Sequence, residues 1–128
     1  MSLELGGKSP VHVFADADID RAISGVAEGI FANAGQVCVA GSRLLVERSV
    51  FEQVVEGVSR IANSLKLGSG FDSESQMGPL ILERHRNYVH ALVTSGVREG
   101  AEALSGGEQY SSSGYFYKPT VLVNVNKE

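Results

Sequence analysis

The stretch PVHVFADADIDRAISGVAEGIFANAG, residues 10–35, predicts a strand followed directly by a helix. Its first five residues alternate in polarity, and they are bounded by Pro10 and by the acidic segment 16–18, which is typical of a strand. Apolar residues then recur at helical spacing up to about Ala34. Asp16 or Asp18 can cap this helix, because a carboxylate accepts hydrogen bonds from the first helical turn. A strand that leads into a helix is the basic unit of α/β folds.

The rest of the chain continues this alternation. The predicted elements are a strand at 44–46, a helix at 49–65, a loop at 68–73, a helix at about 82–99, and strands near 101–104, 115–117 and 120–123. We therefore expect an α/β fold with a largely parallel sheet and flanking helices. The apolar face expected of the third helix consists of Tyr88, Val89, Leu92, Val93 and Val97. Gly25 and Gly29, one helical turn apart, are expected to leave a smooth groove for close packing.

Composition excludes several classes of protein. The chain has 128 residues, 43% of them apolar and 20% charged, as expected of one globular domain. A net charge of −4 without a basic cluster argues against a nucleic-acid partner. The chain shows no apolar run of the ~18 residues that a membrane span needs, and no signal peptide, so we expect no membrane partner. One cysteine excludes an intrachain disulfide and suits the reducing cytoplasm, and with three scattered histidines it predicts no metal site.

Two segments carry candidate chemistry. Cys38, the single cysteine, lies among small residues in Gly35–Arg43, and Glu4 precedes it by 34 positions in Glu4–Pro10. A lone cysteine is by itself weak evidence for a catalytic thiol, since free cysteines are commonly buried. A thiolate with a carboxylate base elsewhere in the chain indicates covalent catalysis. Arg43 is expected to pair with an acid and to fix the cysteine loop.

The two segments together resemble the aldehyde dehydrogenase superfamily. The interval between Glu4 and Cys38 matches that family, and the resemblance continues through Met77–Leu80, Gly114–Phe116 and Pro119-Thr120. It covers the chain after Leu3. The resemblance implies a three-layer α/β catalytic domain in truncated form. Residues 4–128 would be part of that domain, without the nucleotide-binding domain and the C-terminal part, and residues 1–3 would derive from cloning.

The resemblance also implies a reaction and its residues. An aldehyde would be oxidised to a carboxylic acid with NAD or NADP, through a thiohemiacetal and a thioester on Cys38. The Cys38 backbone N–H would stabilise the oxyanion, and Glu4 would activate the water that hydrolyses the thioester. Leu5 and Gly6 would lie near the nicotinamide. His85 stands where many relatives place a glutamine near the cofactor ribose. Val37 and Val39 would border the substrate.

Two alternatives remain at this point. A coenzyme-A-acylating semialdehyde dehydrogenase would replace water by a thiol, although such enzymes tend to lack the base that Glu4 provides. The chain could also be a non-catalytic module that keeps the family scaffold. The complete enzyme is expected to be a homodimer or homotetramer. The isolated chain is expected to be inactive, and apolar surface left uncovered would make it self-associate.

Overall fold

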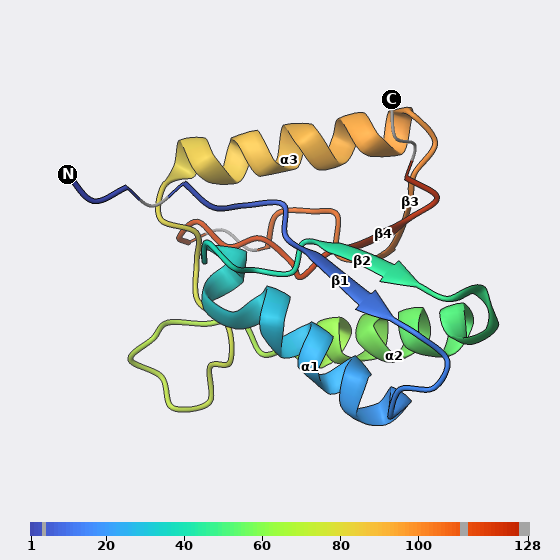
Figure 1. Cartoon of the computed structure of the whole chain (residues 1–128). Coiled ribbons are helices and arrows are strands. Elements are labelled where there is room, and N and C mark those ends of the chain that lie inside the picture. Colours follow the sequence, from blue (N-terminus) through green and yellow to red (C-terminus); the bar gives the residue numbers. More distant parts are fainter. Residues whose placement is uncertain (4, 111–112, 126–128) are drawn as a thin grey trace. The chain divides into compact units, whose positions relative to one another are not determined.

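The first half of the chain contains a parallel strand pair joined by a helix (Figure 1). The computed structural model describes residues 1–3, 5–110 and 113–125. They form two compact units, Met1–Ile61 and Ala62–Glu128. The elements of the first unit, in chain order, are β1 (Pro10–Val13), α1 (Ile19–Phe31), η1 (Ala32–Gly35), β2 (Arg43–Val46), η2 (Arg48–Val50) and α2 (Phe51–Ser64), whose last turn enters the second unit.

β1 and β2 pair in parallel, from Pro10↔Arg43 to Val13↔Val46. Figure 1 shows the two arrows side by side and pointing the same way. α1 makes the crossover between them, as the alternating strand and helix patterns predict. The Asp18 carboxylate accepts a hydrogen bond of 3.1 Å from the Arg21 N–H, so Asp18 is the cap of α1.

The core of the first unit is built mostly from small apolar side chains. Its buried apolar residues are Val13 of β1, Val26, Ala27 and Phe31 of α1, Ala40, and Val54, Val55 and Val58 of α2. Close packing between α1 and α2 occurs at Gly57, where a Cβ would come within 2.5 Å of the Ile23 side chain. Gly25 and Gly29 instead line an open groove beside β1, and a Cβ there would meet no atom within 4 Å. The expected groove is therefore present, but the close contact of the helices lies elsewhere.

The second unit contains one long helix and an antiparallel strand pair. These elements are α3 (Glu83–Arg98), β3 (Glu102–Ser105) and β4 (Val121–Val123). β3 and β4 are antiparallel, with an irregularity between Ala103 and Ser105. The parallel arrangement expected of the sheet thus holds for β1 and β2, while the second pair runs the other way. The α/β class is confirmed.

The strand predicted at 115–117 is not formed. Among the residues that the structure describes, the β pairing of this segment is limited to an isolated bridge between Gln109 and Tyr117. Gly114 just before it has a φ of +90°, a conformation that favours glycine and turns the chain. The Tyr115 carbonyl accepts a hydrogen bond of 3.0 Å from the Leu80 N–H, so the segment contacts a loop rather than a sheet. Of the aromatic side chains in this segment, Tyr117 is buried and Tyr115 is exposed.

The apolar face expected on α3 is largely uncovered. Tyr88 is 62% exposed, Leu92 55% and Val97 44%. Val89 and Val93 are half-buried, and α3 contains no buried residue. Helical spacing of apolar residues identifies one side of a helix, but it does not show what lies against that side. The spacing thus placed these residues on one side of the helix, and the structure adds that Tyr88, Leu92 and Val97 on that side are exposed.

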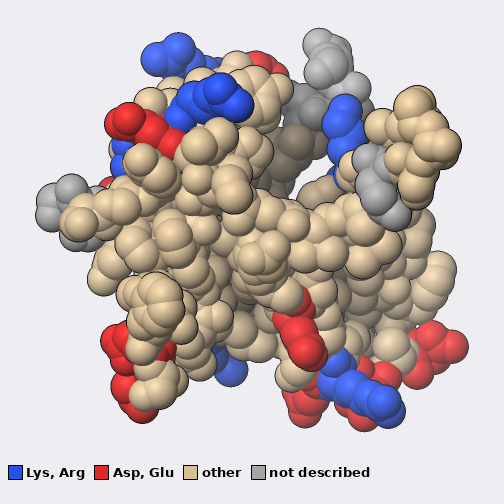
Figure 2. All heavy atoms as spheres, turned by 90° about the vertical axis from the view of Figure 1, so that its left-hand side faces the viewer, with Lys and Arg blue, Asp and Glu red and all other residues tan. Residues whose placement is uncertain are grey.

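Charged side chains do not form a large cluster of one sign on the face shown in Figure 2. Small groups of acidic and basic residues stand there among a wide uncharged surface. Among the described residues, no helix is both long and apolar enough to cross a bilayer.

Glu47 closes the far end of the parallel pair. Its backbone N–H donates to the Val13 carbonyl at 2.9 Å, and its carboxylate accepts from the Ala15 N–H at 2.9 Å and from the Ser49 hydroxyl at 2.8 Å. The hydrogen bonds to the carboxylate lower the pKa of Glu47, and the one from the Ala15 N–H has the largest effect, followed by the one from Ser49. A lowered folded-state pKa stabilises the fold above the unfolded value of about 4.3, and this contribution disappears as the pH falls through the folded-state pKa.

We therefore expect Glu47→Gln to lower the urea midpoint of the chain at pH 7, because an amide accepts these hydrogen bonds more weakly than a carboxylate does. The difference from the wild type should shrink steadily as the pH is lowered below about 4. Glu56→Gln, which removes an exposed carboxylate on α2, serves as the control and should show no such difference. A gap between Glu47→Gln and the wild type that is constant with pH would contradict the assignment.

Candidate active site

The two candidate segments meet at one edge of the parallel pair. Since β1 and β2 are parallel, the residues that precede each strand lie at the same edge. The Arg43 N–H donates to the Ser9 carbonyl at 3.2 Å, and the Arg43 Nε donates to the Lys8 carbonyl at 2.7 Å. Arg43, the last residue of one segment, is thus bonded to the end of the other segment, in agreement with its expected structural role. The acceptors of these two bonds are backbone carbonyls rather than the expected acid.

Gly6 packs directly against Cys38. A Cβ at Gly6 would lie 2.8 Å from the Cβ of Cys38 and 2.8 Å from its carbonyl oxygen. Real Cβ contacts are longer, so a side chain at this position would displace the cysteine or the segment that contains Gly6. This close approach is the physical reason for a glycine two residues after Glu4. It also shows that the segment following Glu4 reaches the cysteine.

Cys38 lies in a tight turn that is anchored on its far side. The Ala40 N–H donates to the Val37 carbonyl at 3.0 Å, which places Cys38 and Val39 at the two central positions of a four-residue turn. Ala40 is buried, and the Gly41 N–H donates to the Gly29 carbonyl of α1 at 3.3 Å. The thiol itself is free and exposed. Cys38 is thus accessible to a substrate, as a nucleophile must be, rather than an inert core residue.

The other residues predicted for the site have the following positions. Glu4 lies outside the described residues. Leu5 is 85% exposed, next to Gly6. Val37 and Val39 flank the thiol and are both exposed, which leaves two apolar surfaces beside it. Within the described ranges, no group of three or more His, Cys, Asp or Glu side chains could hold a metal ion.

His85 belongs to the second unit and is described there. It lies in the first turn of α3, is exposed, and its backbone N–H donates to the Leu82 carbonyl at 3.1 Å. Cys38, Leu5 and Gly6 belong to the first unit. The structure therefore brings Cys38 and Gly6 together within the first unit, while His85 is part of the second unit.

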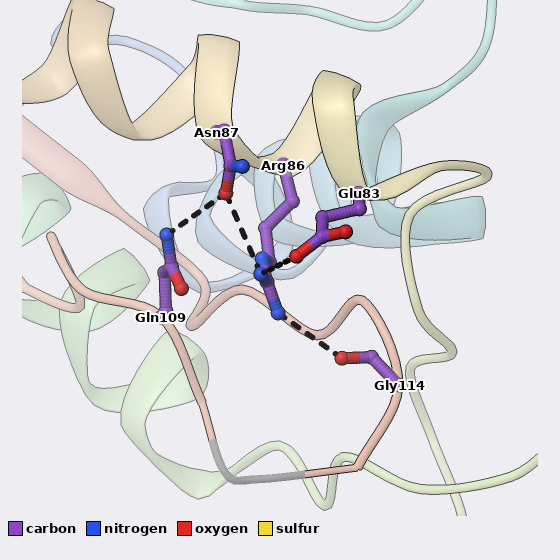
Figure 3. Close-up of polar contacts among 5 residues, drawn as sticks. All are labelled: Glu83, Arg86, Asn87, Gln109 and Gly114. Atoms are coloured by element: carbon purple, nitrogen blue, oxygen red, sulfur yellow. Dashed lines mark hydrogen bonds and ion pairs between the residues drawn. The ribbon is translucent and has the colours of Figure 1, made fainter.

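Arg86, beside His85, makes several contacts, of which only the ion pair with Glu83 follows from helical spacing (Figure 3). Its Nη1 donates to the Gly114 carbonyl at 3.2 Å, and its Nη2 contacts Glu83 at 3.3 Å and Asn87 at 3.4 Å. The Gln109 side chain donates to Asn87 at 3.2 Å. These contacts fix the first turn of α3 on the loop that contains Gln109 and Gly114. An arginine followed by a glycine 28 positions later gives no local signal of such a contact.

Comparisons with known proteins agree on one family. Residues 1–128 match the sequence model described as "Aldehyde dehydrogenase family". The chain is 43% identical over 129 residues to a phenylacetaldehyde dehydrogenase of Pseudomonas fluorescens, covering 100% of the chain and 26% of that protein. It is 42% identical over 132 residues to a betaine aldehyde dehydrogenase of Bacillus subtilis strain 168, covering 100% of the chain and 27% of that protein.

The fold leads to the same group of proteins. A structure described as the NAD+ complex of aldehyde dehydrogenase from Bacillus cereus superposes with a TM-score of 0.93 at 45% identity. The match covers 96% of this chain and 25% of that one. The chain thus spans about a quarter of the length of the proteins it matches.

The contact between Gly6 and Cys38 makes a direct prediction about stability. Gly6→Ala should lower the free energy of unfolding by about 1–3 kcal/mol, because the added Cβ must displace Cys38 or the segment that contains Gly6. Urea unfolding of the 128-residue chain measures this change. The rate at which iodoacetamide alkylates Cys38 in the native chain should change as well.

Gly25→Ala is the matched control. No atom lies within 4 Å of a Cβ at Gly25, and alanine favours a helix interior by roughly 1 kcal/mol over glycine. This variant should therefore be as stable as the wild type or more stable. A Gly6→Ala chain with wild-type stability and wild-type alkylation would show that the two segments do not meet as described.

Proposed function

The chain belongs to the aldehyde dehydrogenase family, and we propose that its Cys38 is the nucleophile of an enzyme that oxidises an aldehyde to a carboxylic acid. One observation carries this proposal: the thiol is exposed at the centre of a closed turn, against the Gly6 backbone of the segment that bears Glu4. We place residues 4–128 in the catalytic domain of that enzyme.

The proposed chemistry assigns one role to each of these groups. The Cys38 thiolate attacks the aldehyde carbon, and the electron pair of the C=O π bond moves to oxygen to give a thiohemiacetal alkoxide. The Cys38 N–H, held by the turn, donates to this oxyanion. The alkoxide electron pair would then re-form the C=O bond as hydride leaves this carbon for the nicotinamide that the enzyme would hold, and a thioester would remain on Cys38. Glu4 then takes a proton from water, the hydroxide adds to the thioester, and the carbon–sulfur bond breaks to release the acid and the thiolate.

The residues around the thiol fit a nicotinamide cofactor. Leu5 and Gly6 are exposed beside Cys38, and Gly6 has no side chain that would keep a flat ring away from the backbone. When bound, NAD or NADP supplies the hydride acceptor. Leu5 and Gly6 would hold the nicotinamide, and His85 would donate a hydrogen bond to a ribose hydroxyl. The NAD+ complexes among the similar structures support this choice of cofactor class.

The proposal extends to the location of the enzyme, its oligomeric state and its substrate. A single free thiol suits a reducing compartment, so we propose a cytoplasmic location. Exposed Tyr88 and Leu92 on α3 support a homodimer or homotetramer of the complete enzyme, and self-association of the isolated chain. The isolated chain is proposed to be inactive. The apolar surfaces of Val37 and Val39 favour an apolar aldehyde.

The nucleophile is tested in an exchanged enzyme, defined as the Pseudomonas fluorescens phenylacetaldehyde dehydrogenase in which these 128 residues replace the matching segment. With NAD+ and phenylacetaldehyde it should form NADH. Cys38→Ala should reduce this turnover on the order of 10³-fold or more, because the covalent route is lost. Circular dichroism checks that the exchanged enzyme and its Cys38→Ala variant have the same fold. A folded exchanged enzyme that keeps its turnover after Cys38→Ala would overturn the proposal.

The role of Glu4 is tested by Glu4→Gln in the same exchanged enzyme. An initial burst of NADH should remain, while steady-state turnover falls by roughly 10²-fold, because general-base catalysis typically contributes 10²–10⁴-fold. Glu28→Gln, an exposed carboxylate on α1, is the control and should leave both phases unchanged. Undiminished turnover of Glu4→Gln, with acyl transfer to added coenzyme A, would favour the acylating alternative.

A further inference from the structure

We propose that Asn33 and Gln36 are positioning residues for the Cys38 thiol; the proposal rests on the proposed role of Cys38 as the nucleophile. The first observation is the backbone that leads into the cysteine turn. Asn33 has a φ of +51° and Ala34 a φ of +54°, and Gly35 follows with a φ of +74°. Glycine adopts this left-handed conformation freely and asparagine tolerates it, but alanine does so only under constraint from its surroundings.

The constraint comes from the side chains of Asn33 and Gln36. The Asn33 Nδ2 donates to the Gln36 carbonyl at 3.1 Å. In return, the Asn33 carbonyl accepts from the Gln36 Nε2 at 3.2 Å and from the Gln36 backbone N–H at 3.1 Å. We call these three reciprocal hydrogen bonds the amide clamp. The clamp holds Ala34 and Gly35 between its two ends, and so it accounts for a left-handed alanine at this position.

The amide clamp joins the cysteine turn without an intervening residue. It ends at Gln36, and the turn closed by the Val37 carbonyl and the Ala40 N–H begins at the next residue. The direction in which the chain leaves Gln36 therefore sets the orientation of the turn that carries Cys38. On its far side the turn is held by backbone hydrogen bonds and by buried Ala40. On its near side it is held by the two amide side chains.

The thiol has little freedom to adjust if the amide clamp is lost. The backbone and Cβ of Cys38 lie so close to Gly6 that a Cβ added at Gly6 would be only 2.8 Å away from them. A turn that tilts on this surface moves Sγ away from its direction of attack, or it displaces the segment that bears Glu4. Misplacement of a reacting group by about 1 Å can reduce a rate by roughly 10²-fold. Loss of the amide clamp should therefore slow bond formation at the thiol more than it weakens substrate binding.

The test uses Asn33→Gly and Gln36→Ala in the exchanged enzyme. Asn33→Gly keeps the left-handed backbone and removes the Nδ2 donor, and Gln36→Ala removes the Nε2 donor. Each should lower kcat by roughly 10-fold to 10²-fold and change KM by less than about 3-fold. If the two side chains act as one unit, the double variant should be no slower than the slower single variant. Gln53→Ala, an exposed amide on α2, should change neither constant.

Asn33→Asp is a second variant in case glycine loosens the fold. It keeps the size and backbone preference of asparagine and lacks the donor, so it should reproduce the loss in kcat. Thermal unfolding of each variant separates the proposal from a purely structural role. Variants that melt at lower temperature with wild-type kcat would overturn it, and so would losses that multiply in the double variant. Retained turnover in Cys38→Ala would instead refute the proposed function itself, whatever the clamp variants show.

Discussion

The parallel register of β1 and β2 is the constraint on which the candidate site depends. It places the two segments that precede these strands at one edge, although 34 positions separate Glu4 from Cys38 in the sequence. Two close approaches make the arrangement specific. Gly6 lies against Cys38, and a Cβ at Gly41 would come within 2.5 Å of the Val11 side chain. At both places the segments meet backbone to side chain, because a glycine leaves the room.

The carboxyl ends and the amino ends of the two parallel strands differ in what lies beside them. In open α/β sheets ligands usually bind beyond the carboxyl ends of the strands. Here the carboxyl ends are tied together by Glu47, whose carboxylate accepts hydrogen bonds from the Ala15 N–H and the Ser49 hydroxyl. The thiol lies at the amino ends, where each strand follows a loop. The carboxyl ends of β1 and β2 are thus fixed by hydrogen bonds, and the exposed cysteine is held in a closed turn at their amino ends.

Local patterns predicted the elements that depend on local interactions. β1, α1 and the Asp18 cap follow from alternation, helical spacing and a carboxylate at the first turn. Contacts made at a distance were not predictable in this way. Local patterns did not show that Tyr88 and Leu92 on α3 are exposed, nor that the segment 115–117, predicted as a strand, makes an isolated bridge through Tyr117 instead. Arg43 donates to backbone carbonyls of a segment 35 residues away, which no local pattern encodes.

The sequence by itself determined the family and the two residues proposed for the chemistry, because a cysteine and a glutamate in glycine-rich frames at a characteristic interval are a linear signal. It did not determine how the thiol is presented. That depended on the parallel pairing, on the contact between Gly6 and Cys38, and on the left-handed turn at Asn33. These are three-dimensional constraints. A glycine in a sequence does not state which neighbour needs its space, and only the tertiary structure identifies that neighbour as the cysteine.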